Sequence, residues 1–272
     1  MSLAVKTYRG CHRTLAILLL SALPVFAYAG FGDVLNMPQG VTPLSRNIYD
    51  LHMLIFYICT AIGAVVFGVM LYSIIVHRKS AGHEAAQFHH STKAEILWTI
   101  IPVFILIGMA IPATLAVIDI EDASEADLSI KVTGYQWKWR YEYLGTDLDF
   151  YSSLAQSSQD AVNTGQDPKE VQHYLLDVDQ RVVVPVNKKI RLLLTADDVI
   201  HAWWIPAFGT KRDAIPGFVN EMWFKATEIG VYRGQCAELC GAFHGFMPIV
   251  VEVKSDEDYQ KWVAEKSAAA GG

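Results

Sequence analysis

Cysteine is scarce in this chain, which has only four cysteines in 272 residues. Cys11 lies near the N-terminus and Cys59 in an apolar segment, where a lone thiol packs as a small hydrophobic side chain. We therefore expect no structural disulfide between these two. The other two, Cys236 and Cys240, are separated by three residues. No Cys-x-x-Cys-His run occurs, which excludes a covalently attached c-type haem.

Charge is absent from two long apolar segments, residues 51–76 and 96–118. Each exceeds the roughly 20 apolar residues that a helix needs to cross a bilayer. The intervening residues 77–95 carry three Lys and Arg side chains and form the basic loop, so we expect this loop to be cytoplasmic. The sequence thus predicts a two-helix transmembrane hairpin over residues 51–118, with both chain ends outside. Such a hairpin serves as an anchor and as a docking surface for a larger membrane partner.

The N-terminal apolar run is short. Residues 15–26 provide about a dozen apolar positions, too few for a spanning helix. Three basic residues precede the run and Ala27-Tyr28-Ala29 follows it, which is typical of a secretory signal peptide. We predict that residues 1–29 are removed, that residues 30–50 face outward, and that the formal net charge changes from −6 to −9.

Residues 119–272 have a different composition, with 24 acidic residues against 15 Lys and Arg. Period-two alternation with Gly and Pro turns predicts an all-β Greek-key sandwich or barrel on the outer side. The predicted strands are residues 128–143 (a strand or hairpin), 181–185, 189–195, 218–226, 230–235 and 248–253. We interpret residues 145–173 as a long surface loop, and residues 257–266 as a short helix followed by a disordered end.

Potential metal ligands are concentrated in residues 234–247. Cys236, Cys240, His244 and Met247 supply two thiolates, an imidazole and a thioether, and His201 adds an upstream imidazole. Soft sulfur ligands with imidazole favour copper or zinc. Five donors are more than one tetrahedral ion needs, and a mononuclear blue-copper site uses a single Cys. The extra thiolate indicates two copper ions bridged by both sulfurs.

Two simpler interpretations of this motif remain. A Cys236–Cys240 disulfide suits an exported domain, but it leaves both histidines and Met247 without a role. Zinc rarely recruits Met, and its structural sites favour closer Cys pairs with more Cys or His ligands.

The pattern Cys-x-Glu-x-Cys-x-x-x-His-x-x-Met, with an upstream His, resembles the dinuclear copper (CuA) motif of cytochrome c oxidase subunit II. The resemblance implies a cupredoxin fold for residues 119–272. It assigns as copper ligands His201, Cys236, Cys240, His244, Met247 and the backbone carbonyl of Glu238. The family places the carboxylate of that same glutamate on a magnesium ion at the interface with subunit I.

Two other stretches resemble the same family. Glu95 stands in a Glu-x-x-Trp-Thr-x-x-Pro context, which in the family marks the entrance of a proton pathway into subunit I; an acid at a helix N-terminus is also favourable by itself. Residues 134–143 resemble the family's Gly-x-Gln-Trp-x-Trp-x-Tyr-Glu-Tyr signature, which assigns Trp137 as the acceptor of electrons from cytochrome c. Aromatic residues also pack well in sheets, and we expect the five alternating ones here to share one face.

The acidic outer domain suits a basic partner. An acidic face steers such a partner and makes its association salt-dependent. The acids that we expect in a docking patch for cytochrome c are Glu142, Asp147, Asp149, Asp197 and Asp198, while Asp213 lies in a segment that the family turns toward subunit I. Taken singly, each is equally consistent with a solvated charge or a turn residue.

The resemblance implies a subunit of a respiratory oxidase. Such a subunit accepts electrons one at a time from cytochrome c and passes them through copper to the haem of subunit I, where oxygen reduction is coupled to proton pumping. The implied partners are subunits I and III, cytochrome c and the lipid bilayer, with no nucleic acid. The predicted location is a bacterial inner membrane, with the copper domain in the periplasm.

Three other classes can be weighed against this one. The family's quinol-oxidase branch lacks these Cys and His ligands. A nitrous oxide reductase carries a large propeller domain, for which 272 residues leave no room. A copper-delivery protein needs neither Trp137 nor Glu95.

Overall fold

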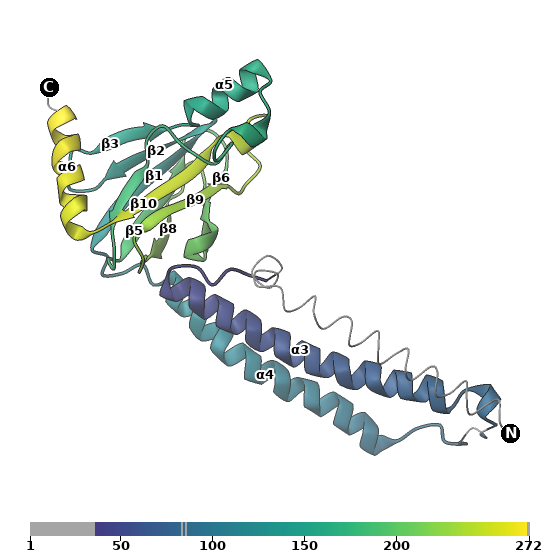
Figure 1. Ribbon diagram of the computed structural model, residues 1–272. Helices are drawn as coiled ribbons and strands as arrows, with labels where there is room; N and C mark the ends of the chain where they lie inside the picture. The colour runs from purple at the N-terminus through teal and green to yellow at the C-terminus, as the bar shows by residue number, and fades with distance from the viewer. Residues whose placement is uncertain (1–35, 83, 85, 271–272) are drawn as a thin grey trace. The chain divides into compact units, whose positions relative to one another are not determined.

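Two long helices are followed by a β domain in the computed structural model, which describes residues 36–82, 84 and 86–270 (Figure 1). The predicted signal peptide at residues 1–29, with Cys11, lies outside the described residues. Short 3-10 turns, labelled η, connect several of the elements.

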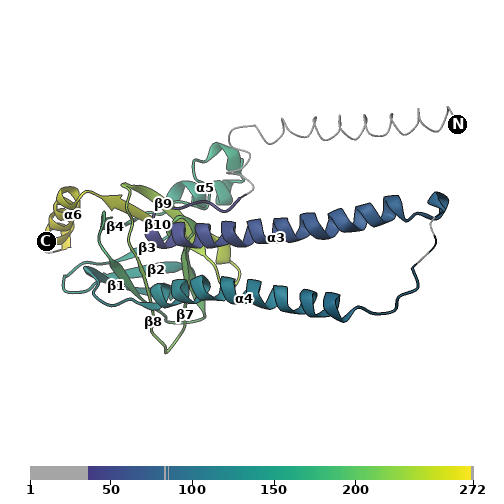
Figure 2. The same cartoon turned by 90° about the horizontal axis from the view of Figure 1, so that it is seen from below.

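The helices α3 (Pro43–Val76) and α4 (Thr92–Glu121) lie side by side in both views (Figures 1 and 2). At 1.5 Å per residue, these helices of 34 and 30 residues are about 51 and 45 Å long, enough to cross a bilayer. Their apolar side chains are largely exposed, as with Val65 at 67% and Phe104 at 69%, which indicates that lipid or partner subunits cover them.

Both helices extend beyond the predicted apolar segments. The first begins eight residues earlier than predicted because Thr42 and Ser45 form a capping box and Pro43 follows the cap. The first turns of α3 carry polar side chains, so hydropathy alone did not reveal them. The second continues through Pro102 and Pro112, as expected for a membrane helix.

In the part of the chain that the structure describes, ten strands form two five-stranded sheets, and the predicted all-β sandwich is confirmed. In spatial order the first sheet contains β3 (Asp149–Ser152), β2 (Lys138–Tyr143), β1 (Leu128–Tyr135), β5 (Ile190–Ala196) and β8 (Asn220–Phe224). The second contains β4 (Val182–Pro185), β10 (Pro248–Lys254), β9 (Gly230–Cys236), β6 (His201–Ile205) and β7 (Thr210–Ala214). The pairs β1–β5 and β4–β10 are parallel, and the other pairs are antiparallel.

The hydrophobic core contains alternate residues of these strands. The burial of β5 alternates strictly, with Ile190, Leu192 and Leu194 at most 1% exposed. Two fully buried tryptophans, Trp139 and Trp203, belong to the same core. Each such aromatic side chain removes on the order of 200 Å² from water, so the strands that carry the candidate site rest on a rigid base.

The prediction that five aromatics of residues 135–143 share one face is wrong. The chain turns at residues 136–137, so that Tyr135 pairs with Lys138 and Gly134 with Trp139. Since directly paired residues share a face, Tyr135 lies on the side of Lys138, and its ring centroid is 5.8 Å from that of Tyr151. Trp139 and two tyrosines further along β2 are buried instead.

The prediction of a long surface loop at residues 145–173 is also wrong. This segment contains β3, the helix α5 (Gln156–Thr164) and the 3-10 turn η3 (Pro168–Glu170). The buried residues of α5 are only Ser158 and Ala161, which are too small to produce a hydrophobic period. Gly165 ends the helix in the left-handed conformation, with φ of 72°.

Three further elements differ from the sequence-based expectation: the helix α6 and the strands β6 and β7. The C-terminal helix α6 (Asp256–Ala270) continues through the alanines that we expected to be disordered, because alanine is the strongest helix former. The strands β6 and β7 were missed by the sequence analysis. Burial along β6 does not alternate, and β7 has the polar sequence Thr-Lys-Arg-Asp-Ala, so neither carries the pattern of a half-buried strand.

Candidate metal centre

The predicted ligand loop connects two paired strands. Cys236 is the last residue of β9, and Met247 directly precedes β10. The backbone N–H of Cys236 donates to the carbonyl of Met247 at 3.3 Å, which closes the base of the loop. Both ends of the loop are therefore fixed by the sheet, as suits a site that must not move.

His201 reaches the same place from the neighbouring strand. β6 pairs with β9 so that Trp203 is opposite Cys236, and the N–H of Ala237 donates to the carbonyl of Ala202 at 3.0 Å. The imidazole is fully buried, and its Nδ1 lies 3.9 Å from Cys236 Sγ. Its Nε2 is 2.9 Å from Asp198 Oδ1, which leaves Nδ1 as the nitrogen directed at the sulfur.

The two thiols and the remaining donors form a compact cluster. Cys236 Sγ and Cys240 Sγ are 3.9 Å apart, so the sulfurs are not bonded to each other in this structure. Cys240 Sγ lies 3.5 Å from both His244 Nδ1 and Met247 Sδ. The thiol of Cys236 donates to the carbonyl of Glu238 at 3.4 Å. All five side-chain donors predicted from the motif, and the predicted carbonyl, thus meet in one place.

This donor set fits a soft metal. Ligand atoms of His201, Cys236 and Cys240 lie within 4.8 Å of one another, and this is the one such group found in the part of the chain that the structure describes. Each cysteine sulfur has one imidazole Nδ1 beside it, so the cluster offers two similar halves. Two thiolates shared between two imidazoles suit a pair of copper ions better than a single tetrahedral ion.

The two thiols differ in acidity. Burial opposes ionisation of Cys236, but the hydrogen bond with the His201 imidazole, the backbone hydrogen bonds with Ala202 and Glu238 and the charge of His201 together outweigh burial and hold the pKa of this thiol below its ordinary value. Burial raises the pKa of Cys240 to about 12, and the neighbouring Cys236 adds to the rise. Burial would lower the pKa of His201, yet hydrogen bonds with Cys236 and Asp198 raise it. Metal binding must therefore displace a proton from Cys240.

Trp137 lies directly against the ligand loop. Its indole Nε1 donates to the carbonyl of Cys240 at 3.2 Å, and the side-chain amide of Gln136 donates to the same oxygen at 2.8 Å. The Trp137 ring is half-buried and meets that of Phe243 edge-on, with centroids 4.9 Å apart. One side of this indole therefore faces the loop, and part of it remains accessible to solvent.

Three of the proposed docking acids, Glu142, Asp147 and Asp149, lie away from Trp137. Glu142 and Asp149 face each other at the other end of β2, and both pair with Arg140. Glu142 also pairs with Lys131. Asp147 lies exposed in the same turn region. These positive partners reduce the negative field that the three acids could offer to a basic protein.

Asp197 and Asp198 lie close to the metal ligands but differ from each other. Both residues are exposed, but Asp198 accepts hydrogen bonds from the backbone of Val199 and Gln136 and also contacts His201. Burial would raise the pKa of Asp198, but the His201 hydrogen bond and the two backbone donors lower it. Neither this role of Asp198 nor that of Gln136 was predicted. Only the spacing of three residues between Asp198 and His201 could have suggested the role of Asp198.

Two other predicted residues lie away from the cluster. Glu95 is in the first turn of α4, half-buried, at the end of that helix distant from β1 along the chain. Asp213 is exposed on β7, where it pairs with Ala202, the residue after His201. Its backbone carbonyl accepts a hydrogen bond of 2.7 Å from the side chain of Asn220. Glu238, whose carbonyl faces Cys236 Sγ, is an exposed residue.

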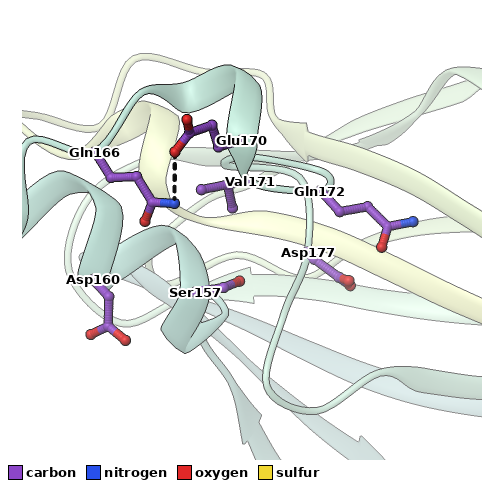
Figure 3. Close-up of a pocket in the computed structure, with 7 residues that line it drawn as sticks. All are labelled: Ser157, Asp160, Gln166, Glu170, Val171, Gln172 and Asp177. Atoms are coloured by element: carbon purple, nitrogen blue, oxygen red, sulfur yellow. Dashed lines mark hydrogen bonds between the residues drawn. The ribbon is translucent and has the colours of Figure 1, made fainter.

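A second recess lies beside α5 (Figure 3). Its volume is about 440 Å³, and it is lined by Ser157, Asp160, Gln166, Glu170, Val171, Gln172 and Asp177. The amide of Gln166 donates to Glu170 at 3.4 Å. Asp177 already pairs with two arginines, Arg181 and Arg233, at 3.6 and 3.7 Å. The recess is open and polar, and nothing in it matches the donor set of the metal cluster.

Replacing Gly134 with alanine should disturb the ligand His201. A Cβ at this position would lie 2.8 Å from His201 Cδ2, and the imidazole is fully buried and cannot move aside freely. We expect a loss of about 1–3 kcal/mol in the free energy of unfolding, measured by denaturant titration, together with weaker copper binding. Gly245→Ala is the matched control, because nothing lies within 4 Å of its Cβ. Equal stability of both variants would contradict this packing.

Fold and ligand set together define a membrane-anchored, cupredoxin-like metal protein. The family model described as "Cytochrome C oxidase subunit II, periplasmic domain" matches residues 128–254, and that described as "Cytochrome C oxidase subunit II, transmembrane domain" matches residues 32–115. The chain belongs to the cytochrome c oxidase subunit II family. It is therefore a subunit of a cytochrome c oxidase, an oxidoreductase.

Relatives agree with this assignment. The chain is 42% identical over 230 residues to the "Probable cytochrome c oxidase subunit 2" of Rickettsia bellii, which covers 84% of this chain and 82% of the relative. It is 35% identical over 284 aligned positions to the "Cytochrome c oxidase subunit 2" of Cereibacter sphaeroides, covering 98% and 92%. The crystal structure of the periplasmic domain of subunit II of cytochrome oxidase of Bradyrhizobium japonicum is 46% identical, with a TM-score of 0.48, covering 54% of this chain and 98% of that one.

Proposed function

We propose that this chain accepts single electrons from a cytochrome c outside the membrane and delivers them to the haem of subunit I, where oxygen is reduced and protons are pumped. The observation that carries this proposal is the cluster of two thiols, two imidazole Nδ1 atoms and one thioether, with neighbouring donors 3.5 to 3.9 Å apart. The rest of the chain provides the frame, the anchor and the partner surfaces.

The residues that would hold the metal are those of the cluster. They are His201, Cys236, Cys240, His244 and Met247, with the backbone carbonyl of Glu238. A dinuclear copper centre supplies one-electron oxidation and reduction when bound. The protein keeps the ligands in place through β6, β9 and β10, so the geometry changes little between redox states. Zinc would fit the thiols but has no redox chemistry and rarely uses Met.

Trp137 is the proposed acceptor of electrons. Its indole contacts the carbonyl of the ligand Cys240, and the edge-on Phe243 extends the aromatic surface toward solvent. Phe243 is 49% exposed and Leu239 is 78% exposed, so an apolar rim surrounds the place where a partner would dock. A cytochrome c that covered this rim would have its haem edge next to the indole and would exclude water from it.

Acidic residues would guide a basic cytochrome c to this rim. Asp197 is exposed close to the ligand strand, and Asp198 also belongs to this side of the site. Glu142, Asp147 and Asp149 lie where β2 turns into β3, and Arg140 offsets two of them. We therefore expect Asp197 to matter most for the salt dependence of association.

Other residues are proposed to serve the contacts with subunit I. Glu95 would mark the entrance of a proton pathway from the cytoplasmic side. The exposed carboxylate of Glu238 would bind magnesium between the subunits, and Asp213 would face the same interface. The apolar surfaces of α3 and α4 would pack against lipid and subunits I and III.

The proposed location is a bacterial inner membrane with the β domain in the periplasm. The basic loop between the two helices supports a cytoplasmic position for that loop. Both helices are long and apolar enough to span a bilayer. Removal of residues 1–29 as a signal peptide would complete the mature chain.

A direct test uses the full-length chain in detergent, loaded with copper and mixed with reduced cytochrome c. We expect rapid oxidation of the cytochrome haem, with electrons taken up in proportion to the bound metal and a rate that falls with added salt. The metal-free chain is the control. If the loaded and metal-free samples left the haem equally reduced, the proposed function would be refuted.

A further inference from the structure

One carboxylate, Asp198, connects two parts of the metal centre that come from different strands. Its Oδ1 lies 2.9 Å from Nε2 of His201, the first residue of β6. Its Oδ2 accepts a hydrogen bond of 2.7 Å from the backbone N–H of Gln136, in the turn between β1 and β2. Oδ1 additionally accepts from the N–H of Val199 at 2.6 Å. Both oxygens are thus occupied within the protein.

The second partner of Asp198 leads back to the ligand loop. The side chain of Gln136 donates to the carbonyl of Cys240 at 2.8 Å, and that of Trp137 donates to the same carbonyl at 3.2 Å. A continuous path of hydrogen bonds therefore runs from one ligand, His201, through Asp198 and Gln136 to another ligand, Cys240. The only carboxylate in this path is that of Asp198.

The contact with His201 has a specific consequence. In a neutral imidazole, the proton that Nε2 donates to a carboxylate leaves Nδ1 as the nitrogen that can bind a metal, and the contact fixes the plane of the ring. Nδ1 is the atom beside Cys236 Sγ. The ring is fully buried, so Nε2 would lack an acceptor if this carboxylate were removed.

The adjacent acid makes a clear comparison. Asp197 carries the same charge one residue away and is exposed, and no hydrogen bond or ion pair of its carboxylate occurs among the residues that the structure describes. If negative charge near the site were all that mattered, the two residues would be equivalent. The hydrogen bonds distinguish them.

We propose that Asp198 is a positioning residue of the metal centre, which orients His201 and holds the Gln136–Trp137 turn on the Cys240 carbonyl. This inference rests on the proposed function, since it takes His201 and Cys240 to be copper ligands. It assigns Asp198 a role distinct from that of a surface charge for docking. Through the turn, the same carboxylate also sets the position of the proposed electron acceptor.

The test compares three full-length variants in detergent: Asp198→Asn, Asp198→Glu and Asp197→Asn. His201 and Gln136 contact different oxygens of Asp198, and in Asp198→Asn one of these oxygens becomes an NH2 donor, so one of the two contacts is lost. In Asp198→Glu the charge is kept, but the extra methylene displaces it. Copper affinity is measured by competition with a chelator, and the copper hyperfine pattern by electron paramagnetic resonance.

We expect about 10- to 100-fold weaker copper binding and an altered hyperfine pattern in both Asp198 variants, since outer ligand partners typically contribute that much. Asp197→Asn should match the wild type in both measurements. Circular dichroism and thermal unfolding of the metal-free proteins establish that each variant is folded.

Wild-type copper affinity and spectrum in both Asp198 variants would overturn the positioning role. Wild-type copper affinity and spectrum in Asp198→Glu alone would also overturn this role, because a negative charge at a displaced position would then be enough. The wild-type chain is measured first. If it lacks the dinuclear spectrum, the proposed function is refuted before any variant is compared.

Discussion

Replacing Cys240 with serine should lower the copper content from about two ions per chain to one or none and abolish the signal of an electron shared between two coppers. The sulfur of Cys240 lies 3.9 Å from that of Cys236 and 3.5 Å from both His244 Nδ1 and Met247 Sδ. A serine hydroxyl is a hard donor that does not bridge copper ions as a thiolate does. Metal analysis and electron paramagnetic resonance on the full-length chain measure both effects.

The matched control is Cys59→Ser. This cysteine is exposed on α3 and belongs to the helix pair, so its replacement should leave copper content and spectrum unchanged. A Cys240→Ser chain that still binds two copper ions with the wild-type spectrum would contradict the assignment of this sulfur as a bridging ligand.

Replacing Trp137 with phenylalanine should slow the oxidation of cytochrome c by about 100-fold, equivalent to about 2.7 kcal/mol in the barrier, while copper content stays at the wild-type level. Phenylalanine keeps an aromatic ring but lacks the Nε1–H that donates to the Cys240 carbonyl. Its smaller ring also reduces the aromatic surface between cytochrome c and the ligand loop. Stopped-flow mixing of the copper-loaded chain with reduced cytochrome c gives the rate.

Trp204→Phe is the control for the loss of an exposed indole. Trp204 lies on β6, is 38% exposed, and has its side chain on the outer surface of that strand. We expect its replacement to leave the rate within about twofold. Equal slowing in both variants would show that Trp137 has no special part in accepting electrons.

The clustering of the candidate ligands and the general fold could be predicted from the sequence because both have strong local signals. The spacing of Cys236, Cys240, His244 and Met247 places four donors on one loop, and the alternating strands on either side predict the frame. His201 is distant in sequence, but the pairing of β6 with β9 puts it where the motif requires it. The apolar helices were predicted for the same reason, from a long and uniform pattern.

Other features could not be predicted because they depend on tertiary contacts. The outward position of Tyr135 follows from the turn at residues 136–137, which breaks the period-two count between β1 and β2. The helix α5 was missed because its buried residues, Ser158 and Ala161, are too small to give a hydrophobic pattern. The partners of Asp198 come from residues 62 positions away and three positions away, and only the folded strands bring them together.

The charge pattern shows the same limitation. Counting acids predicts a negative outer domain, but it cannot tell which carboxylates are neutralised by neighbours. Arg140 pairs with Glu142 on its own strand and with Asp149 on the neighbouring β3, whereas Asp197 stays exposed. Docking strength therefore depends on cross-strand pairing, which the sequence alone does not reveal.

The most direct measurement is the copper stoichiometry of the full-length chain together with its electron paramagnetic resonance spectrum. Our account predicts about two copper ions per chain and one unpaired electron shared equally between them, because two thiols stand between two imidazole Nδ1 atoms. One copper ion per chain with an electron localised on it, or zinc alone, would contradict a dinuclear electron-transfer centre at this site.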